Sequence, residues 1–513
     1  MPKNPTSSLG KVSLVGAGPG DAGLITVRGV ELLASADLVL YDYLANPALL
    51  RHVRADAQLH CLGRHGQGKL WTQQEINQAL VDAAISGKQV VRLKSGDPTV
   101  FARAADEIDA LQSGGIPFEI VPGVTTALAA GACAGVPVTD ARFASAVALV
   151  TGREKPGKSD DSIDYAALAK FPGTLVMYMG VTSAPIWSAA LIAGGKSPET
   201  PCAIIRRCSW PDQETFQCSL GEIATYLHPG SKIRPPVIVV VGEVARQASA
   251  VNWFQQRALF GRRILVTRPQ HQADDLRQTL AELGADVYLQ PAIEISPPRD
   301  WAPVDQAIRD LHQYDWLVFS SANGVHAFLG RLFAQGDDLR AVGHLRLAVI
   351  GTGTAAALAE YHLKADVVPA EYRAESLVDA LKGEADGQQF LLPRASRGRD
   401  VLPQGIVSAG GDATEIVVYQ SDDCTTLSPE IVEAWEQRPM DYVIVTSSAI
   451  ARATVGLLGE RAQQAKFVSI SPITSAALRE VGVEPAVEAK VFTMDGIVAA
   501  LLESVSDELQ RDD

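Results

Sequence analysis

An α/β fold with two domains is predicted for this chain. Short apolar runs end in glycine turns and are followed by helical spacing, and this rhythm repeats from residue 12 onward. The rhythm is lost over residues 245–261 and starts again at Arg263 with turns of different chemistry. A chain of 513 residues also exceeds the ordinary size of one domain. We therefore expect a domain at residues 9–250, a linker at 251–261 and a second domain at 262–505.

Composition and charge argue against several classes of protein. Apolar residues make up 47% of the chain, but no run approaches the roughly 18 residues of a membrane span. Residues 1–10 hold one lysine and no apolar core, so we expect no signal peptide and a cytoplasmic protein. The net charge of −14 argues against a nucleic-acid-binding surface. The cysteines and histidines show no metal-ligand spacing, so reduced thiols and no metal site are expected.

Residues 12–21 read V-S-L-V-G-A-G-P-G-D and predict a strand, a glycine turn and the approach to a helix. A turn with so few side chains lets a ligand come close to the backbone. Gly16 and Gly18 are compatible with the start of a dinucleotide fingerprint, with Asp42 as its ribose-binding acid. Asp21, however, takes the place of the third glycine, so this stretch by itself leaves the ligand open.

Further strands in the first half end in turns of similar chemistry. The four turns read G-A-G-P-G-D, K-S-G-D-P, P-G-V-T-T and Y-M-G. A single glycine turn is usually structural, but parallel strands present their carboxyl ends at one edge, so four such turns favour a shared ligand. Thr72 and Glu75 predict a capping box on the helix that runs to Ile85. Strands are expected at residues 37–43, 89–93, 118–121, 146–151, 174–179, 201–206 and 236–241.

From Leu9 to about Val251 the chain resembles the uroporphyrinogen-III C-methyltransferase family. The shared strings are V-G-A-G-P-G-D, L-Y-D, V-V-R-L-K-x-G-D-P, G-I-P-F-E-x-V-P-G-V-T, Y-M-G and P-P-V-I-V-V-V-G-E-V. The resemblance implies a two-lobed α/β domain of the tetrapyrrole methylase type that uses S-adenosyl-L-methionine and forms homodimers, and it disfavours a dinucleotide. Positions matching the family's cofactor contacts are Pro19, Ser95, Gly96, Asp97, Val100, Thr125, Thr126, Met179 and Cys208.

Two further positions match residues that the family uses in catalysis. Asp42 aligns with an acid/base residue, which removes a proton from the methylated porphyrinogen. As the alternative, Asp42 is a strand-end turn residue or helix cap. Arg64 stands where the family commonly has a lysine proposed as proton donor, and an arginine does not readily release a proton, which leaves it a role in binding substrate carboxylates. Ser95 and Cys208 also depart from the family's small residues.

In the second half the expected strands end in hydroxyl and amide side chains. S-S-A-N-G and T-S-S-A read as copies of one unit, as do G-T-G-T-A-A-A-L and S-P-I-T-S-A-A-L, so we expect two similar lobes that face across a cleft. Hydroxyls at helix starts are ordinarily N-caps. A whole rim of them with Arg394, Arg397 and Arg399 instead predicts a receptor for carboxylates. Strands are expected at residues 263–267, 316–319, 347–350, 390–392, 442–445 and 466–470, and a helix at 274–284.

Gly261 to about Leu502 resembles uroporphyrinogen-III synthase. The shared strings are G-R-R-I-L-V-T-R-P, F-S-S-A-N-G-V, V-I-G-T-G-T-A, A-E-S-L-V-D-A-L, L-L-P-R-A-S-R-G-R-D-V-L-P and V-V-Y-Q. The resemblance implies a two-lobed parallel α/β domain that cyclises hydroxymethylbilane while inverting its last pyrrole ring. Tyr419 is either a general acid that helps the hydroxyl leave or a strand-end aromatic. Positions matching the family's functional residues are Thr354, Tyr419, Ser447 and Thr474.

Together the two resemblances imply a bifunctional enzyme, a lyase and a transferase, that makes uroporphyrinogen III from hydroxymethylbilane. It would methylate this product twice to precorrin-2, on the route to sirohaem or cobalamin. The alternative is a tetrapyrrole-binding or synthase-only protein with a degenerate methyltransferase half, motivated by Arg64 and Ser95. A nicotinamide dehydrogenase is a third possibility. The expected partners are small tetrapyrroles, without nucleic acid or membrane.

Overall fold

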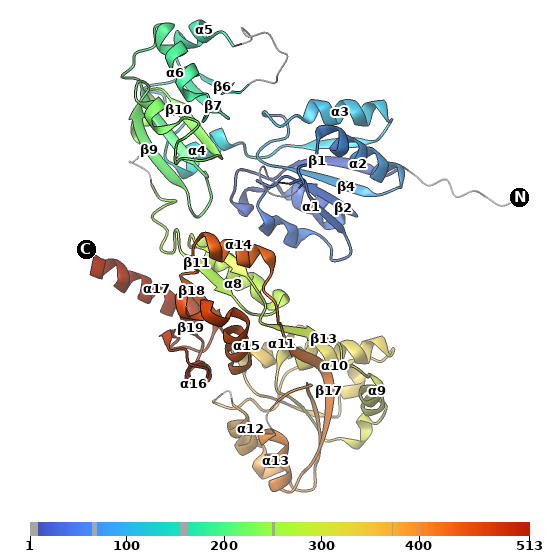
Figure 1. Ribbon diagram of the computed structural model, residues 1–513. Coiled ribbons are helices and arrows are strands. Elements are labelled where there is room, and N and C mark those ends of the chain that lie inside the picture. Colours follow the sequence, from blue (N-terminus) through green and yellow to red (C-terminus); the bar gives the residue numbers. More distant parts are fainter. Residues whose placement is uncertain are drawn as a thin grey trace, which may run out of the picture. The chain divides into compact units, whose positions relative to one another are not determined.

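The computed structural model describes residues 9–63, 69–153, 163–248, 252–371, 373–398 and 400–512 (Figure 1). The chain divides into two compact units. Unit 1 contains Met1–Arg262 and Leu280–Asp286, and unit 2 contains Arg263–Thr279 and Val287–Asp513. Within the described ranges, no helix is both long enough and apolar enough to span a membrane.

Unit 1 begins with a five-stranded sheet and four helices. These are β1 (Lys11–Gly16), α1 (Val27–Ser35), β2 (Leu38–Tyr41), β3 (Gln58–Cys61), α2 (Gln73–Ile85), β4 (Gln89–Lys94), α3 (Ala104–Ser113), β5 (Phe118–Val121) and α4 (Thr126–Cys133). The sheet is parallel throughout, in the order β3-β2-β4-β1-β5. Alternate residues of a strand point to opposite faces, so Leu14 packs with α2 and α3 while Val15 packs with α1. Helices thus cover both faces (Figure 1).

A second sheet completes unit 1. Its elements are β6 (Val147–Thr151), α5 (Tyr165–Ala169), β7 (Thr174–Tyr178), α6 (Ala184–Ala193), β8 (Pro201–Arg206), β9 (Glu214–Ser219), α7 (Ile223–Tyr226) and β10 (Val237–Val241). The order is β6-β7-β10-β8-β9, and only β6 and β7 pair in parallel. This sheet departs from the parallel pairing of the first. The short connection between β8 and β9, which lacks a crossover helix, permits only an antiparallel pair.

Most of the predicted strands of unit 1 are present. β5 and β8 have the predicted bounds. The capping box of α2 is confirmed, because the Glu75 N–H donates to the Thr72 hydroxyl at 3.2 Å and the Thr72 N–H donates to the Glu75 carboxylate at 2.7 Å. Two edge strands, β3 and β9, were not predicted. All four residues of β3 are exposed, so its sequence has no apolar run to mark it.

Unit 2 also contains two five-stranded sheets. One consists of β11 (Arg263–Val266), β12 (Asp286–Leu289), β18 (Tyr442–Val445), β19 (Lys466–Ser469) and β20 (Pro485–Glu488), in the order β12-β11-β18-β19-β20. The other consists of β13 (Ile293–Ser296), β14 (Trp316–Phe319), β15 (Arg346–Val349), β16 (Gln389–Ala395) and β17 (Asp412–Asp423), in the order β13-β17-β16-β14-β15. Ile264 of β11 is paired with Tyr442 of β18. The second sheet is therefore built from the segment between two neighbouring strands of the first.

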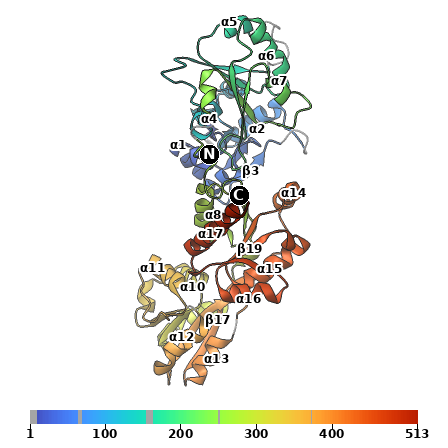
Figure 2. The same ribbon diagram turned by 90° about the vertical axis from the view of Figure 1, so that its left-hand side faces the viewer.

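Helices cover both faces of the β14 sheet, and Figure 2 shows α12 and α13 beside it. Leu317 and Phe319 pack with α9, α10 and α11, whereas Trp316 and Val318 pack with α12 and α13. β13 pairs with β17 in the antiparallel direction. The pairs β11–β18, β18–β19, β19–β20, β14–β15, β14–β16 and β16–β17 are parallel. The helices are α8 (Gln270–Glu282), α9 (Ala302–Arg309), α10 (Ala322–Ala334), α11 (Thr352–Glu360), α12 (Ala374–Leu381), α13 (Val401–Ser408), α14 (Pro429–Gln437), α15 (Ser448–Leu458), α16 (Pro472–Glu480) and α17 (Met494–Asp512).

The two strand–turn–helix units that looked alike in sequence have the same local structure. Ser321 follows β14 and caps α10, and Ser447 follows β18 and caps α15. Both serines have a φ of −163°. Their hydroxyls accept hydrogen bonds from the N–H groups of Gly324 at 3.1 Å and Ile450 at 3.2 Å. The sequence similarity therefore reflects the same capping geometry in each lobe.

Candidate functional sites in the two units

The glycine turns of unit 1 meet at the carboxyl ends of β1, β4 and β5. A Cβ added to Gly123 would lie 2.2 Å from the Gly96 carbonyl oxygen, and one added to Gly16 would lie 2.5 Å from the Gly123 Cα. Gly18 and Gly96 exchange two backbone hydrogen bonds, of 2.8 and 3.2 Å. Gly16 and Gly123 are therefore needed for the turns to pack against one another, independently of any ligand.

Gly96 differs from the other two glycines because its missing side chain faces open space. Its φ is +69°, and no described atom lies within 4 Å of an added Cβ. The same turn continues to Val100, which is half-buried, and to Phe101, which is 40% exposed. A ligand can therefore approach the Gly96 backbone and find apolar side chains beside it.

Tyr178, at the end of β7, joins the second sheet of unit 1 to these turns. Its hydroxyl forms a 2.7 Å hydrogen bond with the Thr125 hydroxyl and accepts one from the Ala127 N–H at 2.9 Å. Its ring centroid lies 5.1 Å from that of Phe101. Met179 comes next, with a φ of +52° and a side chain that is 49% exposed. The ends of β4, β5 and β7 thus lie together and present exposed apolar groups.

The carboxylate of Asp97 is largely engaged by the protein itself. Its Oδ1 accepts hydrogen bonds from the N–H of Thr99 at 2.7 Å and from its hydroxyl at 2.5 Å, and Oδ2 accepts one from the Gly123 N–H at 3.0 Å. Burial alone would raise the pKa of Asp97, but these hydrogen bonds outweigh burial and lower it. Asp97 therefore braces two turns.

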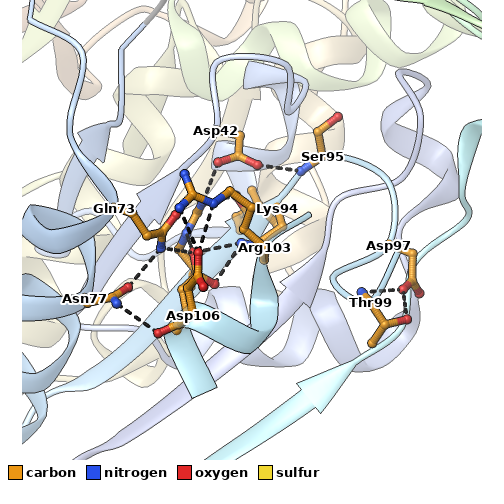
Figure 3. Close-up of polar contacts among 12 residues, drawn as sticks. Asp42, Gln73, Asn77, Lys94, Ser95, Asp97, Thr99, Arg103 and Asp106 are labelled. Atoms are coloured by element: carbon orange, nitrogen blue, oxygen red, sulfur yellow. Dashed lines mark hydrogen bonds and ion pairs between the residues drawn. The ribbon is translucent and has the colours of Figure 1, made fainter. Parts of the chain in front are cut away.

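Asp42 follows β2 and is fixed by two donors (Figure 3). Its Oδ1 accepts a hydrogen bond from Nη2 of Arg92 at 2.5 Å, and its Oδ2 accepts one from the Ser95 N–H at 3.1 Å. The Asp42 side chain remains 31% exposed. The carboxylate is thus held beside the Ser95–Gly96 turn while staying accessible.

A buried charge cluster lies behind Asp42, and Figure 3 shows part of it. Glu107 is fully buried, and it accepts hydrogen bonds from Nε of Arg92 at 3.0 Å and from Nζ of Lys94 at 2.8 Å. Burial lowers the pKa of Lys94, and the neighbouring Arg92 adds to this, whereas Glu107 opposes it. Together with Asp42, the cluster contains two cationic and two carboxylate side chains. Each buried charge therefore has a partner of opposite sign.

The remaining predicted residues of unit 1 have different surroundings. Pro19 and Cys208 are buried, and a Cβ added to Gly20 would lie 3.0 Å from the Cys208 carbonyl oxygen. The turn that follows β8 therefore packs against the first glycine turn. Burial raises the pKa of the Cys208 thiol far above its usual value, so the thiol is neutral. Thr126 is the first residue of α4 and is half-buried, and Arg64 lies outside the described residues.

In unit 2, Tyr419 and Thr354 lie at the same end of one sheet. The Tyr419 hydroxyl forms a 3.0 Å hydrogen bond with the Ser321 hydroxyl and a further one with the Asn323 side chain. Burial raises the pKa of Tyr419, which is 8% exposed, so the phenol is protonated at neutral pH. Thr354 is 5% exposed and lies in the first turn of α11, after β15.

Ser447 and Thr474 lie at strand ends of the other sheet of unit 2. Ser447 caps α15, and the Thr474 hydroxyl is buried and forms a 3.2 Å hydrogen bond with Ser471, the cap of α16. The hydroxyl of Ser448 donates to the Ile473 carbonyl oxygen at 3.4 Å, which joins the two turns. Ser447 and Ser471 therefore serve as helix caps, whereas the Thr474 and Ser448 hydroxyls make local contacts within and between these turns.

The arginines expected to receive carboxylates are paired within unit 2. Arg394 forms an ion pair with Glu415, and Arg397 forms one with Asp423 at 2.6 Å. Arg399 lies outside the described residues. A substrate carboxylate would have to displace one of these pairs or find another cation.

Comparison with known proteins matches one protein family to each half of the chain. The family model of tetrapyrrole (corrin/porphyrin) methylases matches residues 11–224, and that of uroporphyrinogen-III synthase HemD matches residues 274–499. The porphyrin biosynthesis protein HemD of Ruminiclostridium josui is 30% identical over 496 residues, which cover 96% of this chain and 98% of the relative. This chain belongs to the porphyrin biosynthesis HemD family.

Two further relatives of this HemD-family chain match shorter stretches. Uroporphyrinogen-III C-methyltransferase of Bacillus subtilis is 37% identical over 332 residues, covering 64% of this chain and 68% of the relative. Siroheme synthase of Sodalis glossinidius is 44% identical over 250 residues, so this chain spans about half of that relative (52%) and is itself covered to 49%. The two resemblances inferred from the sequence are confirmed.

Sequence reasoning overlooked the charged residues that support Asp42 in this HemD-family chain. Arg92 and Lys94 are two residues apart in an apolar run, so both side chains lie on one face of a buried strand. That pattern was a usable signal, because two buried cations on one face require a carboxylate on the helix above them. Only the packing identifies this carboxylate as Glu107 of α3.

Proposed function

We propose that this chain is a bifunctional enzyme of tetrapyrrole biosynthesis. Unit 2 cyclises hydroxymethylbilane to uroporphyrinogen III, and unit 1 methylates that product twice to give precorrin-2. The observation that carries the proposal is that a methylase module and a synthase module occupy one chain, and that a HemD relative matches both over 96% of it. Because the product of one reaction is the substrate of the other, the fusion raises its local concentration.

For unit 1 we propose S-adenosyl-L-methionine as the methyl donor. This molecule carries a sulfonium methyl group that a carbon nucleophile can take directly. The residues present fit it: Gly96 has open space beside its backbone, and Phe101 and Met179 are exposed apolar groups nearby. In this proposal the Asp97 carboxylate of the same turn contacts a ribose hydroxyl. The protein's contribution is to hold donor and acceptor in line and to exclude water.

In the same proposal Asp42 is the general base of unit 1. Deprotonation of the methylated carbon requires a carboxylate held within hydrogen-bond reach of that proton. Arg92 and the Ser95 N–H fix the orientation of Asp42, and its exposed fraction of 31% leaves it accessible to a substrate. Arg64 is proposed to bind a substrate carboxylate.

In unit 2 Tyr419 is proposed as the general acid for loss of the substrate hydroxyl. It is protonated at neutral pH, and Ser321 orients its hydroxyl. Folding a flexible linear substrate into the geometry of ring closure supplies most of the remaining acceleration. Thr354, Ser447, Thr474 and Arg394 are proposed to contact the substrate.

The proposal is tested by incubating the full chain with hydroxymethylbilane and methyl-labelled S-adenosyl-L-methionine. We expect label in a dimethylated product. Cyclisation without transfer of label would instead support the synthase-only alternative. Sedimentation at micromolar concentration tests the proposed homodimer. Whether precorrin-2 then serves sirohaem or cobalamin is decided by the enzymes that consume it.

A further inference from the structure

Arg268, two residues after the end of β11, has a guanidinium group that pairs with no carboxylate among the residues that the structure describes. Its Nη1 lies 2.9 Å from the sulfur of Met494, and its Nη2 donates to the side-chain oxygen of Gln272 at 3.3 Å. Its Nε is buried and has no hydrogen-bond partner. Among the described residues of unit 2, Arg331, Arg394 and Arg397 each have a carboxylate partner.

Arg268 is half-buried, and a cation that is partly desolvated without an ionic partner lowers the stability of a fold. Desolvation of a charge is unfavourable unless an ion pair or a complete set of hydrogen bonds offsets it. Burial lowers the pKa of the Arg268 guanidinium. Such a group gains stability when an anion binds to it.

The position of Arg268 connects it to the residues proposed to act in unit 2. The Gln272 side chain that accepts from Arg268 also donates to the Asn323 side chain at 2.7 Å. Asn323 in turn is hydrogen-bonded to the Tyr419 hydroxyl. A chain of polar contacts thus runs from the carboxyl end of β11, in one sheet of unit 2, to Tyr419 in the other sheet.

We propose that Arg268 binds a carboxylate side chain of the tetrapyrrole substrate of unit 2. The inference rests on the function proposed for this unit. Nε and one Nη of a guanidinium lie side by side and match the two oxygens of a carboxylate. A carboxylate bound to Nε and Nη2 would give Nε the partner that it lacks, and it would sit beside the Nη2 contact with Gln272. It would also hold the substrate at the end of the contact chain that leads to Tyr419.

The test compares Arg268→Gln with Arg452→Gln in the full chain. Arg452 lies on α15 of the same unit and pairs with Glu480 at the surface, so its loss is a matched control. With hydroxymethylbilane as substrate, we expect Arg268→Gln to raise KM at least about tenfold, with a smaller change in kcat, because a hydrogen-bonded charge pair is lost. The control should keep the KM of the parent chain. Arg268→Lys keeps the charge but loses the paired N–H donors, so its KM should lie between those of the parent chain and Arg268→Gln.

Two further measurements separate binding from a structural role. Uroporphyrin III, a stable octacarboxylate, should bind to Arg268→Gln with a Kd raised by a similar factor. The melting temperature of the ligand-free variant should be equal to or higher than that of the parent. Unchanged KM and Kd, or a lower melting temperature with unchanged KM, would overturn the proposal. If the parent chain does not consume hydroxymethylbilane, the proposed function fails, and the Kd for uroporphyrin III still decides the role of Arg268.

Discussion

Nη2 of Arg92 lies 2.5 Å from Oδ1 of Asp42, and the same guanidinium donates through Nε to the fully buried Glu107. One arginine thus connects an accessible carboxylate at the end of β2 to a buried carboxylate of α3. The orientation of Asp42 is therefore set from within the core of unit 1.

Replacing Asp42 by Asn should slow methylation by about 10²–10⁴-fold, because a positioned general base is lost. Binding of S-adenosylhomocysteine, measured by calorimetry, should be retained, since the amide keeps the shape of the carboxylate. Asp56→Asn, at an exposed carboxylate, is the control. Normal rates of label transfer in Asp42→Asn would remove Asp42 from the catalytic role.

Glu107→Gln should destabilise unit 1 by about 3–5 kcal/mol, because it leaves Arg92 and Lys94 buried without their shared carboxylate. Urea unfolding followed by tryptophan fluorescence measures this change. Glu31→Gln removes an exposed partner of Arg28 and should change stability by less than about 0.5 kcal/mol. A loss of under about 1 kcal/mol in Glu107→Gln would show that the cluster is dispensable.

Asp97→Asn should lower the stability of unit 1 by about 1–3 kcal/mol at pH 7, because one amide N–H must then face a backbone N–H. The pKa of Asp97 is lower in the folded protein than its unfolded value of about 3.9. Between these two pKa values the unfolded chain therefore binds more protons than the folded chain. The contribution of Asp97 to folding stability is complete above about pH 4 and is lost as the pH falls below it. The difference in melting temperature between parent and variant should be constant from pH 5 to pH 8 and shrink below about pH 4. A difference that grows on acidification would contradict this account.

Two glycines of the same site should respond differently to alanine. Gly123→Ala places a Cβ 2.2 Å from the Gly96 carbonyl oxygen, so the turns must separate and unit 1 should unfold at a lower temperature. Gly96→Ala meets no neighbouring atom and costs only about 1–2 kcal/mol for the left-handed backbone. Its main effect should be weaker binding of S-adenosyl-L-methionine. Equal affinity in Gly96→Ala and the parent chain would place the cofactor elsewhere.

Tyr419→Phe should slow cyclisation by about 10²-fold or more, because the ring still packs in the core while the proton donor is gone. Tyr361→Phe is a matched control, since the Tyr361 hydroxyl forms its hydrogen bond with His326 and not with Ser321. Because burial raises the pKa of Tyr419, the rate of the parent chain should not fall between pH 7 and pH 9 through loss of this proton. Parent-like kcat in Tyr419→Phe would exclude the general-acid role.

Local patterns in the sequence determined a large part of this fold. Apolar runs bounded by glycine or hydroxyl turns located β5, β8, β14 and β18 at the residues where they lie. The rule that parallel strands share an edge was enough to expect the turns at Gly16, Gly96 and Gly123 to meet, and they touch through their backbones. The repeated hydroxyl turns predicted two similar lobes, and in the structure Ser321 and Ser447 have the same capping geometry.

Only the tertiary structure decided which distant segments become partners. Periodicity reports whether a residue is buried, but it does not identify the neighbour, which depends on packing between residues far apart in the chain. The adjacency of β11 and β18, the pairing of Arg394 with Glu415 and the hydrogen bond between Asp97 and the Gly123 N–H are all of this kind. The same holds for Arg268: that no described carboxylate pairs with it is a property of its surroundings and not of its sequence position.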